Sequence, residues 1–312
     1  MEIYDLKVNG LVNPVGYIFD NTEVSWKVNG ANGTKQDNAV IEVGLDEDFG
    51  QTLIYKQSKE LDSLGVSLEI ELRPYTRYYF RVTVTSDSSE TAVSDTCFFE
   101  TAKMNDEWKA RWIGVIGDDD HHPEFVKNFS SKKPIENARL YITGLGLFEA
   151  YINGEKVGND LLAPFINDYK DNIQYCTYDV TGLIKDENAI KVMLGNGWYK
   201  GRFGFDGSKG CFGDKFALIA ELKLDYIDGT TETICTDETW KYRESYIDYS
   251  DIYGGEIQNF MRYNTSEIVW KNAAYIEAAH RLSERYSLPL HEMEDIPVRE
   301  VIKTPADETV LD

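Results

Sequence analysis

Apolar and polar residues alternate with a period of two in many short runs, separated by turn signals such as Asn153-Gly154 and Asp228-Gly229. Such alternation is typical of strands that bury one face. The clearest runs lie at 23–28, 39–43, 66–72, 80–84, 138–143, 148–152, 189–194 and 216–226. Helical spacing is convincing only at 272–283, and even there Tyr275-Ile276, like 296–302, could equally form an edge strand. The pattern predicts an all-β protein built from β-sandwiches.

The chain is long enough for more than one core. Its 312 residues, 42% of them hydrophobic, exceed the range in which a single core usually keeps growing. The 20 Tyr, 14 Phe and 6 Trp suit pleated, half-buried surfaces. We predict two domains, at 1–103 and 104–295, followed by a linker at 296–312.

Charge and the absence of long apolar runs exclude several kinds of partner. Lysine and arginine number 32 against 54 aspartate and glutamate residues, a formal net charge of −22 that repels a phosphate backbone. No apolar run reaches the roughly 18 residues of a membrane span, and the start MEIYDLKVNG lacks the features of a secretory signal. We therefore expect no nucleic acid or membrane partner and a cytoplasmic location, although a removed signal peptide would leave the same sequence.

The four cysteines, Cys97, Cys176, Cys211 and Cys235, lie in unrelated surroundings. They form no C-x-x-C motif and have no spacing that suggests a metal cage or a disulfide framework. We interpret all four as buried thiols.

The first hundred residues contain a corner motif, Leu72-Arg73-Pro74-Tyr75-Thr76, which runs directly into the strand pattern Tyr78-Tyr79-Phe80-Arg81-Val82. This combination resembles a fibronectin type III domain. In such sandwiches a tyrosine of the penultimate strand hydrogen-bonds back onto the corner, and a tryptophan such as Trp26 fills the core. The motif indicates the fold and says nothing of function.

The second unit has a strand, a glycine-permitted bend, a second strand and an Asn-Gly hairpin at 140–158. Leu162-Ala163-Pro164, Asn167-Asp168-Tyr169, 175–181 and 194–204 follow. In this order the motifs resemble the N-terminal sandwich module of bacterial α-L-rhamnosidases of glycoside hydrolase family 78. The resemblance implies two consecutive β-sandwiches, the first immunoglobulin- or fibronectin III-like and the second a larger jelly roll of the galactose-binding kind.

Residues 195–201, Gly-Asn-Gly-Trp-Tyr-Lys-Gly, place an aromatic pair beside an amide and a cation. The C–H face of a sugar stacks on aromatic rings, while its hydroxyls need directional donors and acceptors. We therefore predict that Asn196, Trp198 and Tyr199 bind sugar, with an ordinary core beside a tight turn as the alternative. The resemblance adds Glu256, because Ile252-Tyr253-Gly254-Gly255-Glu256 is similar to a family motif near the end of this module.

Residues 167–172, Asn-Asp-Tyr-Lys-Asp-Asn, offer several oxygen ligands to a hard cation such as Ca²⁺. The spacing is not that of the twelve-residue calcium loop, and a solvated acidic loop is the alternative. Some members of the resembled family carry a calcium-dependent rhamnose site with Asp-Asn ligands, which points to Asp171 and Asn172, with Asn167-Asp168 in competition. For the charge run at 118–122 we favour a solvated loop, since adjacent residues of an extended chain point in opposite directions.

In the resembled family the catalytic acid and base lie on an (α/α)₆ barrel that follows the sandwiches, and the sequence shows no such helical repeat. The resemblance therefore implies the N-terminal portion of an α-L-rhamnosidase, catalytically inactive alone, with 296–312 leading toward a missing catalytic domain. Its partner would be L-rhamnose or a rhamnosylated glycan, bound as by a carbohydrate-binding module. The alternatives are a structural spacer that positions the catalytic domain or mediates oligomer contacts, and a small glycosidase complete in itself.

Overall fold

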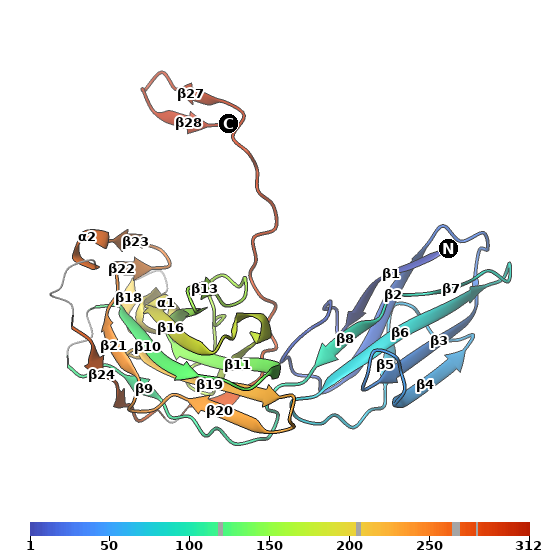
Figure 1. Ribbon diagram of the computed structural model, residues 1–312. Helices are drawn as coiled ribbons and strands as arrows, with labels where there is room; N and C mark the ends of the chain where they lie inside the picture. The colour runs from blue at the N-terminus through green and yellow to red at the C-terminus, as the bar shows by residue number, and fades with distance from the viewer. Residues whose placement is uncertain (118–120, 204–206, 264–268, 279) are drawn as a thin grey trace.

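The computed structural model describes residues 1–117, 121–203, 207–263, 269–278 and 280–312. It contains two β-sandwiches in succession and a C-terminal arm that ends in a hairpin (Figure 1). The prediction of an all-β chain with two consecutive sandwiches is confirmed. Within the described ranges, no helix is long and apolar enough to span a membrane.

The first sandwich packs a three-stranded sheet on a five-stranded one. The three-stranded sheet has the order β1-β2-β5, with β1 (Glu2–Val8), β2 (Thr22–Asn29) and β5 (Val66–Leu68). The other has the order β4-β3-β6-β7, and β8 also pairs with β6; its strands are β3 (Gln36–Gly44), β4 (Thr52–Ser58), β6 (Arg77–Ser86), β7 (Thr91–Val93) and β8 (Cys97–Glu100). Alternate residues of β6 are buried along its whole length, as the period of two requires.

Trp26, which is 2% exposed, lies in the core of this sandwich as expected. The corner also forms as expected, because the hydroxyl oxygen of Tyr78 accepts a hydrogen bond of 2.8 Å from the backbone N–H of Arg73. The buried ring of Tyr78 stacks on Phe99 with centroids 5.0 Å apart. The corner thus closes over the core and fixes the start of β6.

The second sandwich consists of two larger sheets. One has the order β15-β11-β19-β9-β25, with β20 also pairing with β19. Its strands are β9 (Ile113–Gly114), β11 (Ile135–Leu145), β15 (Cys176–Asp179), β19 (Ala217–Tyr226), β20 (Thr231–Cys235) and β25 (Ala274–Tyr275). The other has the order β13-β12-β16-β10-β21-β24, formed by β10 (Pro123–Ser130), β12 (Leu147–Ile152), β13 (Glu155–Lys156), β16 (Glu187–Gly195), β21 (Lys241–Glu244) and β24 (Lys271–Asn272). Their facing apolar residues form the largest core of the chain.

Short elements decorate this sandwich and the arm. Four two-stranded pairs occur in the described residues: β14 (Asn172–Gln174) with β26 (Arg281–Ser283), β17 (Arg202–Phe203) with β18 (Ser208–Lys209), β22 (Ile247–Asp251) with β23 (Gly255–Gln258), and β27 (Val301–Lys303) with β28 (Thr309–Leu311). The helical turns are η1 (Thr181–Leu183), α1 (Gly197–Lys200) and α2 (Phe260–Tyr263). These short pairs lie outside the two large sheets, in connecting segments of the kind that often carry function.

Two expectations need correction. The helical spacing at 272–283 is misleading, and edge strands form there instead, since Tyr275 of β25 pairs with Ile113 of β9 at the edge of a sheet. Pairing with a strand distant in sequence has overridden the local pattern. The expectation of buried thiols holds for Cys176, but Cys211 is exposed on a loop, and Cys97 and Cys235 are half-buried.

Buried charges join the two sandwiches. Glu100, at the end of β8, accepts hydrogen bonds from Arg139 of β11 and, at 2.7 Å, from Nε of Arg77. Nη1 of Arg139 lies 2.9 Å from the carboxylate of Asp179 on β15. Because the acid comes from the first sandwich and one guanidinium from the second, this network fixes one sandwich against the other.

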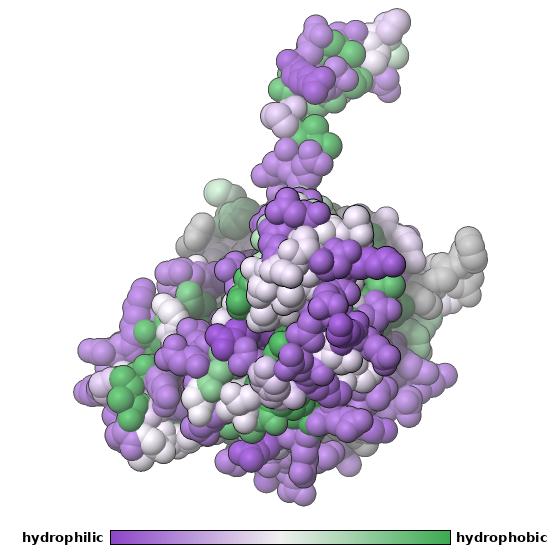
Figure 2. Space-filling view, turned by 90° about the vertical axis from the view of Figure 1, so that its right-hand side faces the viewer, coloured by the Kyte–Doolittle hydropathy of each residue, from purple (hydrophilic) through white to green (hydrophobic). Residues whose placement is uncertain are grey.

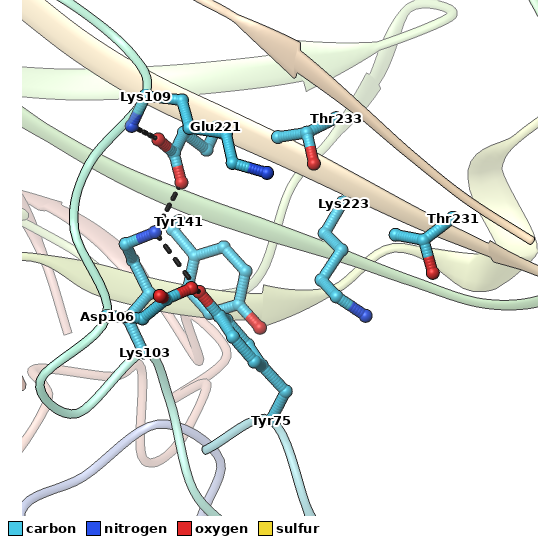
Figure 3. Close-up of a pocket in the computed structure, with 9 residues that line it drawn as sticks. All are labelled: Tyr75, Lys103, Asp106, Lys109, Tyr141, Glu221, Lys223, Thr231 and Thr233. Atoms are coloured by element: carbon cyan, nitrogen blue, oxygen red, sulfur yellow. Dashed lines mark hydrogen bonds and ion pairs between the residues drawn. The ribbon is translucent and has the colours of Figure 1, made fainter.

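A second buried ion pair lies nearby, at a small pocket of about 70 Å³. Figure 3 shows Lys103 between the carboxylate of Glu221 and the hydroxyl of Tyr75, at 2.5 and 3.2 Å. The other Glu221 oxygen accepts hydrogen bonds from the backbone N–H groups of Lys109 and Ala110. Burial, together with a hydrogen bond to Asp106, raises the pKa of Tyr75, so its hydroxyl stays protonated. The segment that links the sandwiches is therefore packed and hydrogen-bonded.

The C-terminal arm, residues 291–312, extends away from both sandwiches (Figure 1). Figure 2 shows the arm standing off the body, with hydrophobic side chains among hydrophilic ones in the hairpin. The segment expected as a linker thus contains the β27–β28 hairpin, whose residues are exposed.

Candidate functional site

The predicted sugar loop forms the turn of helix α1 directly after strand β16. Gly197, at φ +54°, is required here, because a Cβ atom would lie 2.6 Å from Cγ of Leu147. The N–H of Lys200 donates to the carbonyl of Asn196 at 3.1 Å, which closes the turn. Residues four apart share one side of a helical turn, whereas a residue two positions on points away. Asn196 and Lys200 therefore face one side, and Trp198 faces the other.

The aromatic pair of the loop is divided between surface and interior. Trp198 is half-buried and contacts Phe165, with ring centroids 5.8 Å apart. Tyr199 is 6% exposed, and its ring packs against Tyr169 at 5.1 Å. A Cβ at position 213 would lie 2.0 Å from the Tyr199 hydroxyl oxygen. Tyr199 therefore packs into the interior beneath the loop, and Trp198 is the ring of the pair that remains partly exposed to solvent.

The predicted calcium ligands lie on a tight turn. The N–H groups of Asp171 and Asn172 both donate to the carbonyl of Asp168, at 2.9 and 2.8 Å. Nδ2 of Asn172 donates to the Ser283 hydroxyl at 2.7 Å, but its Oδ1 is buried without a hydrogen-bond partner. The carboxylate of Asp171 is exposed, whereas Oδ1 of the competing Asn167 accepts from the N–H of Gln174.

These groups partly fit a hard cation. A buried oxygen without a partner is costly unless a cation, water or donor satisfies it, and amide and carboxylate oxygens are the ligands that calcium takes. Among the described residues, no group of three or more His, Cys, Asp and Glu side chains is arranged for a metal ion. Any calcium site would thus depend on the Asn172 amide oxygen, backbone carbonyls and water beside Asp171.

The structure brings this turn next to the sugar loop. Phe165 and Tyr169, which precede Asp171 and Asn172 on the same segment, contact Trp198 and Tyr199. The segment that carries Asp171 and Asn172 is therefore packed against the loop that carries Trp198 and Tyr199.

The other side of α1 borders a pocket of about 310 Å³. Its walls include Asn196 and Lys200 of the α1 turn, Lys209 of β18, Asp248 of β22, and His122 and Asp214 from loops. Nδ2 of Asn196 donates to the carbonyl of Ser250 at 2.8 Å, which holds the amide against strand β22. Of the lining residues, only Asn196 was predicted to bind; Lys200 belongs to the same loop, and the others come from distant parts of the sequence.

His122 lies at the base of this pocket and is 2% exposed. Its Nδ1 is 3.2 Å from the carbonyl of Leu194, and its ring is 5.4 Å from the ring of Phe216. Burial lowers the pKa of His122 to about 4, so the imidazole is neutral at pH 7. A neutral imidazole whose Nδ1–H donates to Leu194 keeps Nε2 as an acceptor.

Glu256 lies on the strand next to Ser250, whose carbonyl accepts from Asn196 of the sugar loop. It is exposed on β23, where it pairs with Ser250 across the hairpin. Asp251, which directly precedes the motif 252–256, has a carboxylate that accepts from the N–H groups of Arg202 and Tyr253 at 2.9 and 3.0 Å. Burial opposes ionisation of Asp251, but these donors lower its pKa. Of the charge run at 118–122, residues 118–120 lie outside the described residues; the expected solvated loop is wrong for His122, which is buried, while His121 is exposed.

Comparison with known proteins gives consistent matches along the chain. Residues 3–105 match the Rha78A-like, N-terminal immunoglobulin domain, and residues 133–303 match the alpha-L-rhamnosidase N-terminal domain. An alpha-L-rhamnosidase of Formosa agariphila is 31% identical over 268 residues, which are 79% of this chain and 29% of that protein. The native rhamnosidase structure from Aspergillus terreus has a TM-score of 0.84 at 28% identity, over 100% of this chain and 38% of that one. The one from Dictyoglumus thermophilum has a TM-score of 0.80 at 29% identity, over 98% and 38%.

The fold and these matches define a class first: an immunoglobulin-like sandwich followed by a larger sandwich, as found in the N-terminal part of longer proteins. The chain belongs to the alpha-L-rhamnosidase N-terminal domain family. It spans between 29% and 38% of the length of the three relatives described.

Proposed function

We propose that this chain is the accessory N-terminal region of an α-L-rhamnosidase and that it binds an L-rhamnose unit of a glycan with the help of calcium. Catalysis would come from a part of the enzyme outside the chain. The observation that supports the binding role most directly is the buried, unpartnered Oδ1 of Asn172, on the segment whose Phe165 contacts Trp198.

The residues of the proposed site would have different roles in binding. Asn172 and Asp171 would hold the ion, which when bound supplies a positive charge that sugar hydroxyl oxygens can coordinate. The partly open ring of Trp198 offers the C–H face of the sugar an apolar contact. The net charge of −22 repels negatively charged ligands, but it does not affect the binding of a neutral sugar.

Calorimetry tests the proposal. Titration of the chain with L-rhamnose is expected to give a calcium-dependent heat of binding that a chelator removes, whereas D-glucose, the control, should give no calcium-dependent heat. Asp171→Ala should weaken binding at least tenfold because it removes the charged oxygen ligand, and Trp198→Ala should do so by removing the apolar contact. Asp186→Ala, an exposed acid at the opposite end of β16, is the matched control and should bind as the parent chain does.

A spacer is the second candidate function, and the buried ion pairs that join the sandwiches favour it. A rigid pair of sandwiches suits the positioning of another domain. Absence of rhamnose binding with and without calcium would reject the binding role and leave the spacer.

A further inference from the structure

The pocket of about 310 Å³ is lined by Asn196 and Lys200 of the α1 turn, and its lining includes none of Trp198, Asp171 and Asn172. Its lining comes from five separate stretches of the second sandwich, so it is a product of the fold and not of one loop.

The pocket is lined by hydrogen-bond donors, by acceptors and by groups of both charges. Lys200 and Lys209 carry donors, Asp214 and Asp248 carry acceptors, and the neutral imidazole of His122 adds a further polar atom. Equal numbers of cations and carboxylates favour neither an anion nor a cation. They suit an uncharged ligand with many hydroxyl groups, each of which both donates and accepts.

The size and rigidity of the pocket agree with such a ligand. Small-molecule pockets begin at about 300 Å³, so this one suits a ligand no larger than one or two sugar rings. The amide of Asn196 is held by Ser250, and the ring of His122 by Leu194. Polar groups that are already in place lose little freedom when a ligand binds, which favours affinity.

We propose that this pocket is a second sugar subsite, which binds a neutral monosaccharide unit without calcium. The choice of a sugar as ligand rests on the proposed function. Both subsites include residues of the α1 turn, so one glycan chain that crosses this turn can contact both. Such a chain gains from the high effective concentration of its second unit.

The test is saturation-transfer NMR of the full chain in EDTA, with L-rhamnose, D-galactose and D-glucose as probes. At least one of these sugars is expected to bind at millimolar concentration and to shift the side-chain amide signal of Asn196. The double variant Lys209→Ala, Asp214→Asn should reduce this affinity at least tenfold. Both residues are exposed, so the variant should retain the unfolding midpoint of the parent chain.

The matched control is Lys185→Ala, Asp186→Asn, which removes the same charges from exposed positions before β16. This control and Asp171→Ala should both bind in EDTA as the parent chain does. The proposal is overturned if none of the three sugars binds in EDTA, or if the pocket variant binds as well as the control. Failure of the proposed function gives a different result, namely rhamnose binding that calcium does not increase.

Discussion

His122 shows how burial sets the chemistry of a single side chain. An unperturbed histidine has a pKa near 6.5, whereas desolvation lowers the pKa of His122 to about 4. Between these values the unfolded chain binds more protons than the folded chain. The free energy of unfolding must therefore fall as the pH is lowered from about 6.5 to about 4.

We expect this histidine to contribute a loss of roughly 3 kcal/mol across that window, since each pKa unit corresponds to about 1.4 kcal/mol. His122→Asn, which keeps a donor for the Leu194 carbonyl, should remove this part of the pH dependence. Urea unfolding of both chains at pH 4 and pH 7 measures the difference. His121→Asn, on the exposed neighbour, serves as the control, and an equal effect of the two substitutions would contradict the assignment.

At the scale of elements, the position of α1 depends on the close approach of two chain segments. Gly146 links β11 to β12 with φ +114°, and a Cβ there would lie 2.3 Å from the carbonyl oxygen of Gly195, where β16 ends. Only glycine allows both this backbone angle and this approach. The start of the sugar loop is therefore set by a contact between non-adjacent strand ends.

Gly146→Ala should destabilise the chain by about 2–4 kcal/mol, because it adds a backbone clash to the strain of a positive φ. Gly154→Ala is the matched control: its φ is +87°, but nothing lies within 4 Å of the added Cβ. The control should cost only about 1 kcal/mol. Urea unfolding measures the stability of both variants. Equal losses of stability would show that the close approach to Gly195 is unimportant.

At the scale of the whole molecule, the buried Lys103–Glu221 pair ties the linking segment to the second sandwich. Their side chains are 3% and 4% exposed. Removing one member of such a pair leaves an uncompensated buried charge, which is worse than losing both. The joint between the sandwiches therefore depends on the pair being complete.

We expect Lys103→Met to lower the free energy of unfolding by about 3–5 kcal/mol. Adding Glu221→Gln should restore part of this loss, since glutamine still accepts from the N–H groups of Lys109 and Ala110. Lys59→Met, which breaks an exposed pair with Asp37, should change stability by less than about 1 kcal/mol. Chemical denaturation of the four chains tests this, and a double variant weaker than Lys103→Met would refute it.

The fold could be predicted largely from the sequence, because alternation with a period of two follows from the covalent geometry of an extended chain. The run at 80–84 lies within β6, and the corner motif led to the hydrogen bond between Arg73 and Tyr78. The helical spacing at 272–283 failed because an edge strand gains its partner, Ile113, from a distant segment.

The sequence by itself determined the all-β class, the two sandwiches and the glycine-rich turn that carries Asn196 and Trp198. Only the tertiary structure decided which side chains surround that turn. Strand β16 lies between β12 and β10, and this order brings His122 and Asp248 to Asn196 while it buries Tyr199; Glu256 stays exposed on β23. Local periodicity indicates which face of a strand is buried. The pairing of distant strands depends instead on how the whole core packs, and no short stretch of residues determines that packing.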